Sequence, residues 1–319
     1  MTTALEPRPL GATGIRVPPL CVGTSPLASM SALYGYDVDE ERAVATVEAA
    51  FAGPIPFLDT SNGYGEHGEA EQRIGIAVRR AGGLPDGVLL ATKVDPAHGS
   101  DDFSGERVRR SLEESLERLG VDRVPLLHLH DPERIPFEDG VARGGPVEAL
   151  VELRDRGLVD AIGVAGGPVP LLQRYLDTGA FDVVLSHNRY TLLDRSAEAL
   201  FAAASAAGLG VLNAAPYGGG MLVKGPGVQA KYAYGERDAG VADAARAMAE
   251  ACVRAGVTLA AAALQFSTRS AHVHSTVVGV SSPARIAQTV ELATTPVPDD
   301  LWAELEALAP PRERWLDPS

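Results

Sequence analysis

The feature that most constrains this 319-residue sequence is an alternation of short apolar runs with amphipathic segments, repeated eight times. The apolar runs are predicted strands, and they cover residues 20–24, 57–60, 88–93, 124–130, 161–165, 183–187, 210–215 and 275–280. The amphipathic segments are predicted helices, and they cover residues 39–52, 69–81, 104–120, 146–157, 170–178, 195–208, 239–256 and 282–293. A helix between successive strands brings each strand back parallel to the last. Eight such units therefore favour a closed (β/α)8 TIM barrel over an open doubly wound sheet.

No linker, low-complexity tract or charge block interrupts the sequence, so we expect one domain over residues 1–319. Segments 258–270 and 299–309 are predicted as extra helices outside the eightfold repeat. The segment 216–238, after the seventh strand, is unusually long. Loops of this length in compact domains are commonly lids or ligand clamps, and this one contains Tyr217, Lys224, Tyr232 and Tyr234.

The charge balance excludes some partners. Lys and Arg total 28 against 42 Asp and Glu, which gives a net charge of −14. A surface this acidic repels nucleic acid and anionic membranes, so we expect neither as a partner. No apolar run approaches the roughly 18 residues that span a membrane, and the first residues lack the pattern of a secretory signal. We therefore expect a cytoplasmic protein, whose oligomeric state stays open.

The two cysteines, Cys21 and Cys252, lie far apart and in different predicted elements. Neither belongs to a CxxC pattern or stands beside clustered histidines, as a zinc or redox site would require. The sequence thus predicts two buried free thiols and no metal site.

Titratable side chains stand at or just past the ends of three consecutive predicted strands. Asp59 ends the second strand and Tyr64 follows in its loop, Lys93 ends the third, and His130 ends the fourth. The carboxyl ends of barrel strands meet on the face where active sites are built. This convergence indicates an enzyme. His128 points to the same side of its strand as His130, but His130 is nearer the strand end and is the expected catalytic histidine.

These side chains suit proton transfer to or from an oxygen. A phenol has a pKa of about 10, and an ammonium at Lys93 is expected to lower the pKa of Tyr64 while Asp59 keeps the lysine charged. His130 can orient a carbonyl or alcohol oxygen and share the proton. Because no side chain supplies a hydride, a redox reaction at this site needs a cofactor.

In this order and on these strands, the residues resemble the aldo-keto reductase superfamily over nearly the whole chain. Residues 59–60 with 64–65 are similar to its strand-two signature, and residues 71–75 resemble its Glu-x-x-x-Gly helix stretch. Lys93 and His130 complete the resemblance. It implies an oxidoreductase with NADP or NAD as cofactor and these four side chains, with Tyr64 as acid/base, as the catalytic set.

Residues 185–195 and 215–217 resemble most the branch of aldose and pyridoxal dehydrogenases. The resemblance implies oxidation of a sugar such as fucose or galactose at C1, or of pyridoxal. A small carbonyl compound or sugar is the expected substrate.

The resemblance also implies where the cofactor binds. Residues 279–288 resemble the region that holds the adenosine phosphate end, and His187 stands where a glutamine usually holds the nicotinamide amide. The expected cofactor-binding residues are His187, Tyr217, Ser281, Ser282, Arg285 and Gln288. The run 163–167 lacks the family's usual Ser and Asn, and Ala214 replaces a stacking aromatic. Gly279 replaces a lysine often found for the 2′-phosphate, which leaves NAD as open as NADP.

Two other functions fit the same residues. A lyase or isomerase would use Lys93 as a Schiff base, which borohydride would trap. A non-catalytic nicotinamide-sensing barrel would bind the cofactor tightly and need a protein partner.

Overall fold

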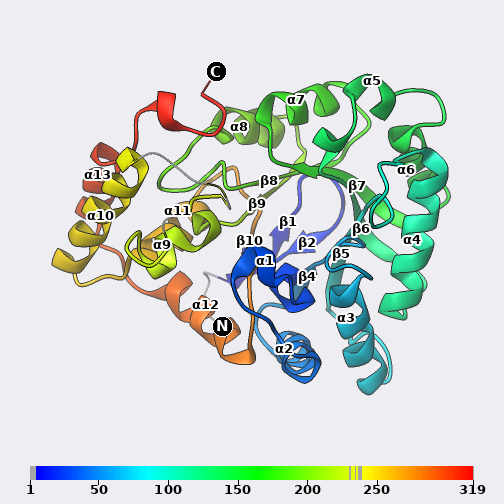
Figure 1. Cartoon of the computed structure of the whole chain (residues 1–319), viewed down its shortest axis with the longest axis horizontal. Coiled ribbons are helices and arrows are strands. Elements are labelled where there is room, and N and C mark those ends of the chain that lie inside the picture. Colours follow the sequence, from blue (N-terminus) through cyan, green and yellow to red (C-terminus); the bar gives the residue numbers. More distant parts are fainter. Residues whose placement is uncertain (1–4, 230, 234, 236–238, 319) are drawn as a thin grey trace.

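The computed structural model describes residues 5–229, 231–233, 235 and 239–318. Within this part, eight parallel strands close a barrel in the order β10-β3-β4-β5-β6-β7-β8-β9, with helices around its outside (Figure 1). The strands are β3 (Leu20–Gly23), β4 (Phe57–Asp59), β5 (Leu89–Val94), β6 (Val124–His130), β7 (Val159–Gly166), β8 (Val183–His187), β9 (Gly210–Ala214) and β10 (Ser275–Gly279). The predicted (β/α)8 TIM barrel is confirmed.

The helices that return the chain between strands agree with the predicted ranges to within about a turn. They are α2 (Glu40–Ala52), α3 (Glu69–Arg80), α4 (Gly105–Leu119), α6 (Pro146–Asp155), α7 (Val169–Asp177), α8 (Glu198–Ala206), α10 (Ala239–Arg254) and α12 (Pro283–Thr294). The two extra helices are confirmed as α11 (Leu259–Thr268) and α13 (Asp299–Ala307). Short helices not predicted from the sequence are η2 (Ser25–Ala28), α1 (Ser31–Tyr34), η3 (Pro132–Arg134), α5 (Phe137–Gly140), η4 (Gly218–Gly220), α9 (Met221–Lys224) and η5 (Arg312–Arg314).

Alternate residues of each strand face opposite sides of the barrel wall. One set, including Phe57, Ala91 and Leu126, forms an apolar cluster inside the barrel. The other set, including Leu58 and Leu127, packs against the surrounding helices. By the same alternation, the residues two and four positions after Ala91 and Leu126 face the interior, which directs polar groups at the strand ends into the mouth.

An N-terminal hairpin covers the amino-terminal end of the barrel. Its strands β1 (Arg8–Pro9) and β2 (Arg16–Val17) pair antiparallel, and neither strand was predicted from the sequence. Leu10 and Val17 are fully buried in the same cluster as the barrel interior. A Cβ at Gly210 would lie 2.7 Å from the Leu10 side chain, so the hairpin packs directly on the start of β9.

Helices α3 and α4 approach each other closely at Gly75. A Cβ at this position would come within 1.9 Å of the backbone oxygen of Arg118, so only glycine fits the crossing. The adjacent Glu71 is fully buried and accepts from Thr92 Oγ1 at 2.6 Å and from Arg118 Nη1 at 3.2 Å. This contact ties the helix pair to the wall at β5.

The segment after β9 contains η4 and α9 rather than a continuous loop. Tyr232 anchors it, because this buried side chain lies 2.7 Å from Thr191 Oγ1 and donates to the backbone oxygen of Asn188 at 2.8 Å. Lys224 lies 5.8 Å from the ring centre of Tyr36, in the segment after α1. The expected role of this segment as a lid stays a prediction, and Tyr234 lies outside the described residues.

Cys21 and Cys252 are buried and free, as predicted. Among the described residues no single helix is both long and apolar enough to cross a membrane. Helices α10 and α11 reach that standard only as a pair, with a bend of 100° between them.

Candidate active site

Lys93 is the centre of the polar cluster at the barrel mouth. Its ammonium lies 2.5 Å from Asp59 Oδ2, 2.7 Å from the backbone oxygen of Thr60 and 3.0 Å from Tyr64 Oη. The side chains of Lys93 and Asp59 are 2% and 3% exposed. An ammonium has three N–H donors, and here each has an acceptor. Three of the four predicted catalytic residues are therefore in direct contact.

The pKa of Tyr64 shifts in the direction opposite to the prediction. Desolvation of the phenol, followed by the negative charges of Asp59, Asp131 and Asp95, raises the pKa of Tyr64 well above its usual value. The expectation that Lys93 would lower it was wrong. The reason is geometric, because the Lys93 charge is paired with Asp59 at 2.5 Å and leaves little net positive potential at the phenol. Tyr64 is thus held in its protonated, phenol form.

His130 lies beside Tyr64, with ring centres 5.6 Å apart in an edge-to-face arrangement. Its Nδ1 lies 2.8 Å from Oδ1 of Asp95 and 3.0 Å from Ser61 Oγ. Burial lowers the pKa of His130, but the charges of Asp131 and Asp95 outweigh this, and the pKa is raised from its usual value. All four predicted catalytic residues are thus brought together.

Asp95 is a site residue that the sequence reasoning missed. It follows Lys93 by two positions, so it points to the same inner side of the wall, and it is 2% exposed. Its carboxylate also accepts from the backbone N–H of Gly63 at 2.9 Å and from the Ser61 hydroxyl. A Cβ at Gly63 would lie 2.7 Å from Cγ of Asp95, so glycine makes room for the carboxylate. The strand period alone was the available signal.

His128 is a barrel-interior residue and not part of the site. It is fully buried, pairs in register with Lys93 and Gly163, and neither ring nitrogen has a partner among the described residues. A Cβ at Gly163 would lie 2.2 Å from its Nδ1, so the ring fills the space that this glycine leaves. Burial lowers the pKa of His128 well below its usual value and keeps the ring neutral.

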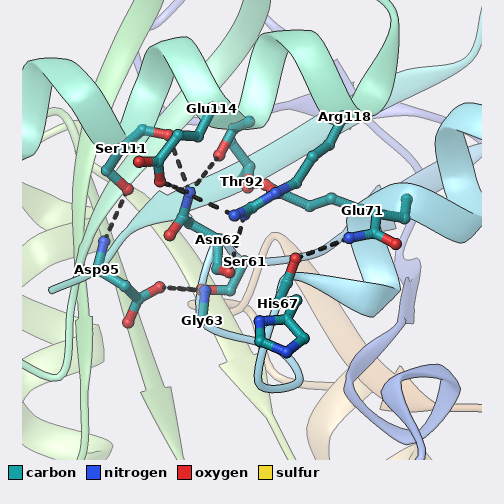
Figure 2. Close-up of polar contacts among 12 residues, drawn as sticks. Ser61, Asn62, Gly63, His67, Glu71, Thr92, Asp95, Ser111, Glu114 and Arg118 are labelled. Atoms are coloured by element: carbon teal, nitrogen blue, oxygen red, sulfur yellow. Dashed lines mark hydrogen bonds and ion pairs between the residues drawn. The ribbon is translucent and has the colours of Figure 1, made fainter. Parts of the chain in front are cut away.

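Helix α4 holds the loop that carries Tyr64 (Figure 2). The amide of Asn62 donates to the backbone oxygen of Ser111 at 3.0 Å and to Glu114 at 3.2 Å. Ser111 Oγ accepts from the backbone N–H of Asp95 at 3.0 Å. Arg107 pairs with Glu114 through both terminal nitrogens, at 2.8 and 2.7 Å, and donates to the backbone oxygen of Asp95. One helix therefore positions both Tyr64 and Asp95.

The backbone is strained just past three strand ends. Asp131, Asn188 and Ala215 have φ angles of 42°, 61° and 55°, in the left-handed region that side chains rarely adopt. Each of these residues donates its N–H to a backbone oxygen of the neighbouring strand, which holds the conformation. Such strain is commonly found at functional sites.

The predicted cofactor-binding residues lie along β8, β9, β10 and α12. Ser282 is the N-cap of α12 without a side-chain cap hydrogen bond, and Arg285 and Gln288 are paired on its exposed side at 2.5 Å. Burial raises the pKa of Tyr217, and the nearby positive charge of Arg285 offsets part of this rise. Burial lowers the pKa of His187 to about 4, so this ring is neutral near pH 7.

Three possible metal ligands do meet at the mouth. Asp131, Glu133 and His187 offer atoms within 4.8 Å of one another. Nδ1 of His187 already lies 3.0 Å from the side-chain amide of Asn188, and Glu133 is exposed. The group carries no argument for an ion, and the absence of a metal stays a prediction.

Comparison with known proteins finds relatives that match this chain over nearly its whole length. The chain is 33% identical to an L-galactose dehydrogenase of Arabidopsis thaliana, over 99% of this chain and 98% of the relative. It is 33% identical to a D-threo-aldose 1-dehydrogenase of Pseudomonas sp (92% and 94%) and 29% identical to a pyridoxal 4-dehydrogenase of Microbacterium luteolum (95% and 97%).

Solved structures agree on the fold. A crystal structure described as an aldo-keto reductase from Pseudomonas aeruginosa matches 90% of this chain and 93% of its own, at 24% identity and a TM-score of 0.65. The sequence model of the Aldo/keto reductase family matches residues 19–310. This range includes all of the barrel strands and the Asp59, Tyr64, Lys93 and His130 cluster. The chain therefore belongs to the aldo/keto reductase family and is an oxidoreductase.

Proposed function

We propose that this protein transfers a hydride between NAD or NADP and a small carbonyl or alcohol substrate, either an aldose or an aromatic aldehyde such as pyridoxal. The observation that carries the proposal is the contact of Lys93 with both Asp59 and Tyr64, beside the ring of His130. Members of the family generally use nicotinamide cofactors, and three full-length relatives are named as dehydrogenases of aldoses or pyridoxal.

Each residue of the cluster has a proposed role in that reaction. Tyr64 is the acid/base group at the substrate oxygen, and its raised pKa keeps it protonated and ready to donate. Lys93 fixes the phenol at 3.0 Å, and Asp59 neutralises and holds Lys93. His130 orients the oxygen through its Nε2, because Nδ1 is held by Asp95.

The residues at the mouth fit a nicotinamide dinucleotide. Helix α12 begins after Ser282, whose side chain makes no cap hydrogen bond, and the positive end of a helix suits a phosphate. Arg285 adds a positive charge beside it. Oδ1 of Asn188 and the hydroxyl of Tyr217 are buried without a partner among the described residues. Polar atoms of this kind are available to a bound carboxamide or ribose. When bound, the cofactor supplies the hydride that no side chain can provide.

Lys93 is poorly arranged for the alternative Schiff-base chemistry. A Schiff base forms from a neutral amine with a free lone pair, whereas this nitrogen is ion-paired with Asp59 and directs all three donors to acceptors. The side chain is also 2% exposed, which leaves little access for a carbonyl carbon. No observation favours a purely sensing barrel.

The test follows nicotinamide absorbance with NAD and with NADP against a panel of aldoses, pyridoxal and simple aldehydes. A Tyr64→Phe variant serves as the matched control, because it removes only the hydroxyl. Turnover that is lost in Tyr64→Phe supports the proposal and identifies cofactor and substrate class together. Absence of binding of either cofactor would sink it.

A further inference from the structure

The loop that carries Tyr64 starts from a buried residue and then becomes exposed. Tyr64 stands between Gly63 and Gly65, and Gly65 has a φ of 94°, in the left-handed region that favours glycine. Residues 63–67 are exposed or half-buried, whereas Asn62 is only 6% exposed. Asn62 is therefore the last buried point of the chain before the phenol, and the place of the phenol depends on how firmly this residue is held.

Helix α4 holds both polar atoms of the Asn62 side chain (Figure 2). Nδ2 donates to the backbone oxygen of Ser111 at 3.0 Å and to Glu114 Oε2 at 3.2 Å, and it lies 3.4 Å from Ser115 Oγ. Oδ1 accepts from Arg107 Nη2 at 3.3 Å. These partners fix the orientation of the amide, because the reverse orientation would set Nδ2 against the guanidinium and Oδ1 against two acceptors.

The backbone of Asn62 is fixed as well. Its N–H donates to the backbone oxygen of Lys93 at 3.1 Å, and its oxygen accepts from Arg118 Nη1 at 3.3 Å. The same nitrogen of Arg118 donates to the fully buried Glu71, which accepts from Thr92 Oγ1. Thr92 precedes Lys93 in β5. Asn62 thus connects the strand that carries Lys93 to the helix that supports the Tyr64 loop.

The partners on α4 form one polar face of the helix. They recur at spacings of three and four residues, which places them on the same side, and they are Arg107, Ser111, Glu114, Ser115 and Arg118. Both serines are buried and Arg107 is 8% exposed. Buried polar groups cost free energy unless their hydrogen bonds are made, so this face needs a polar counterpart. Asn62 provides it.

We infer that Asn62 is a positioning residue for the acid/base Tyr64, because it holds the loop so that the hydroxyl keeps its 3.0 Å contact with Lys93. The inference rests on the proposed function and deepens the role of Tyr64 in it. A misplacement of about 1 Å can lower a rate about 100-fold. Loss of this anchor is therefore expected to lower kcat, while the cofactor still binds.

The first test needs no substrate. It records carbon-13 NMR of the tyrosine rings, in which the Tyr64 signal is the one absent from a Tyr64→Phe variant. We expect this signal to move in Asn62→Ala, because the hydroxyl leaves its contact with Lys93. Leu112→Ala is the matched control, since Leu112 is buried in the hydrophobic core on α4 and its truncation destabilises the fold by a cavity. A Tyr64 signal that is unchanged in Asn62→Ala, or moved equally in Leu112→Ala, overturns the inference.

The second test exchanges two interacting groups, and it decides the question if Asn62→Ala does not fold. Asn62→Asp keeps the size of the side chain but sets an oxygen against Ser111 and Glu114, where Nδ2 had donated. We expect kcat to fall about 100-fold, with the cofactor affinity kept. Adding Glu114→Gln restores a donor opposite the new carboxylate and is expected to recover kcat about tenfold. No loss in Asn62→Asp, or no recovery in the double variant, contradicts the inference.

A third measurement separates positioning of the phenol from a general effect on the fold. If Asn62 acts through Tyr64, Asn62→Asp causes no further loss of kcat in the Tyr64→Phe background, where the hydroxyl is already absent. An equal loss in both backgrounds overturns the inference. Failure of the proposed function looks different, because the wild type then binds or turns over no nicotinamide cofactor. The NMR signal of Tyr64 still decides in that case whether Asn62 holds the phenol.

Discussion

The contact between Lys93 and Asp59 allows the structural and catalytic roles of a buried ion pair to be separated. Lys93→Met removes the ammonium and leaves the Asp59 carboxylate, which is 3% exposed, without its cation. The second oxygen of Asp59 has no partner among the described residues, so nothing else compensates the charge. Breaking one partner of a buried pair costs about 3–5 kcal/mol of unfolding free energy.

Adding Asp59→Asn to Lys93→Met removes the unpaired charge. We expect the double variant to be more stable than Lys93→Met alone, by about 2–3 kcal/mol, a coupling typical of residues in direct contact. Both variants remain inactive, because the phenol of Tyr64 loses its fixing contact in each. Stability is measured by urea unfolding at pH 7, followed by both circular dichroism and tryptophan fluorescence.

The stability gap between these two variants also depends on pH. Burial raises the pKa of an unpaired carboxyl in the folded state. The penalty in Lys93→Met is therefore full above that raised pKa and fades as the pH falls toward about 3.9, the unfolded value. If the double variant is no more stable than Lys93→Met, and the difference does not change with pH, the pair is not energetically coupled and the reasoning fails.

Three further outcomes are expected. Tyr64→Phe loses about 10²- to 10⁴-fold in kcat but keeps cofactor affinity, and unchanged kcat would exclude the phenol from the reaction. Gly75→Ala places a Cβ 1.9 Å from the backbone oxygen of Arg118. The resulting overpacking is expected to lower the free energy of unfolding by about 1–3 kcal/mol. An unchanged free energy of unfolding would mean that α3 and α4 can move apart without cost. Arg285→Ala raises KM for the cofactor without changing kcat, and equal loss with NAD and NADP would argue against a 2′-phosphate contact.

The eightfold repeat made the barrel predictable, because strand and helix periods recur across the whole chain and each unit supports the next. The short pieces were not predictable in the same way. The hairpin of β1 and β2 has two residues per strand, and α1 and α5 have four residues each, too few for a period to appear. The hairpin depends instead on packing, because Leu10 and Val17 are buried in the cluster of the barrel interior.

The positions of the residues in the catalytic cluster could be predicted from the sequence, but the pKa shifts within the cluster could not. Strand ends indicated Asp59, Tyr64, Lys93 and His130, since parallel strands bring such residues together. The direction of the Tyr64 pKa depended on how closely Lys93 pairs with Asp59, which no spacing reveals. Asp95 was overlooked because it lies one residue past the strand, where two side chains of α4 hold its backbone by hydrogen bonds that no sequence spacing reveals.

The hairpin at the amino-terminal end of the barrel limits the route by which ligands can enter and leave the enzyme. Leu10 and Val17 close that end with fully buried side chains, so every ligand must pass through the opposite mouth. For the proposed function, cofactor and substrate would enter through the same mouth, so the one that binds deeper would bind first and leave last. We therefore expect sequential, ordered steady-state kinetics. The product-inhibition patterns would identify which ligand binds first.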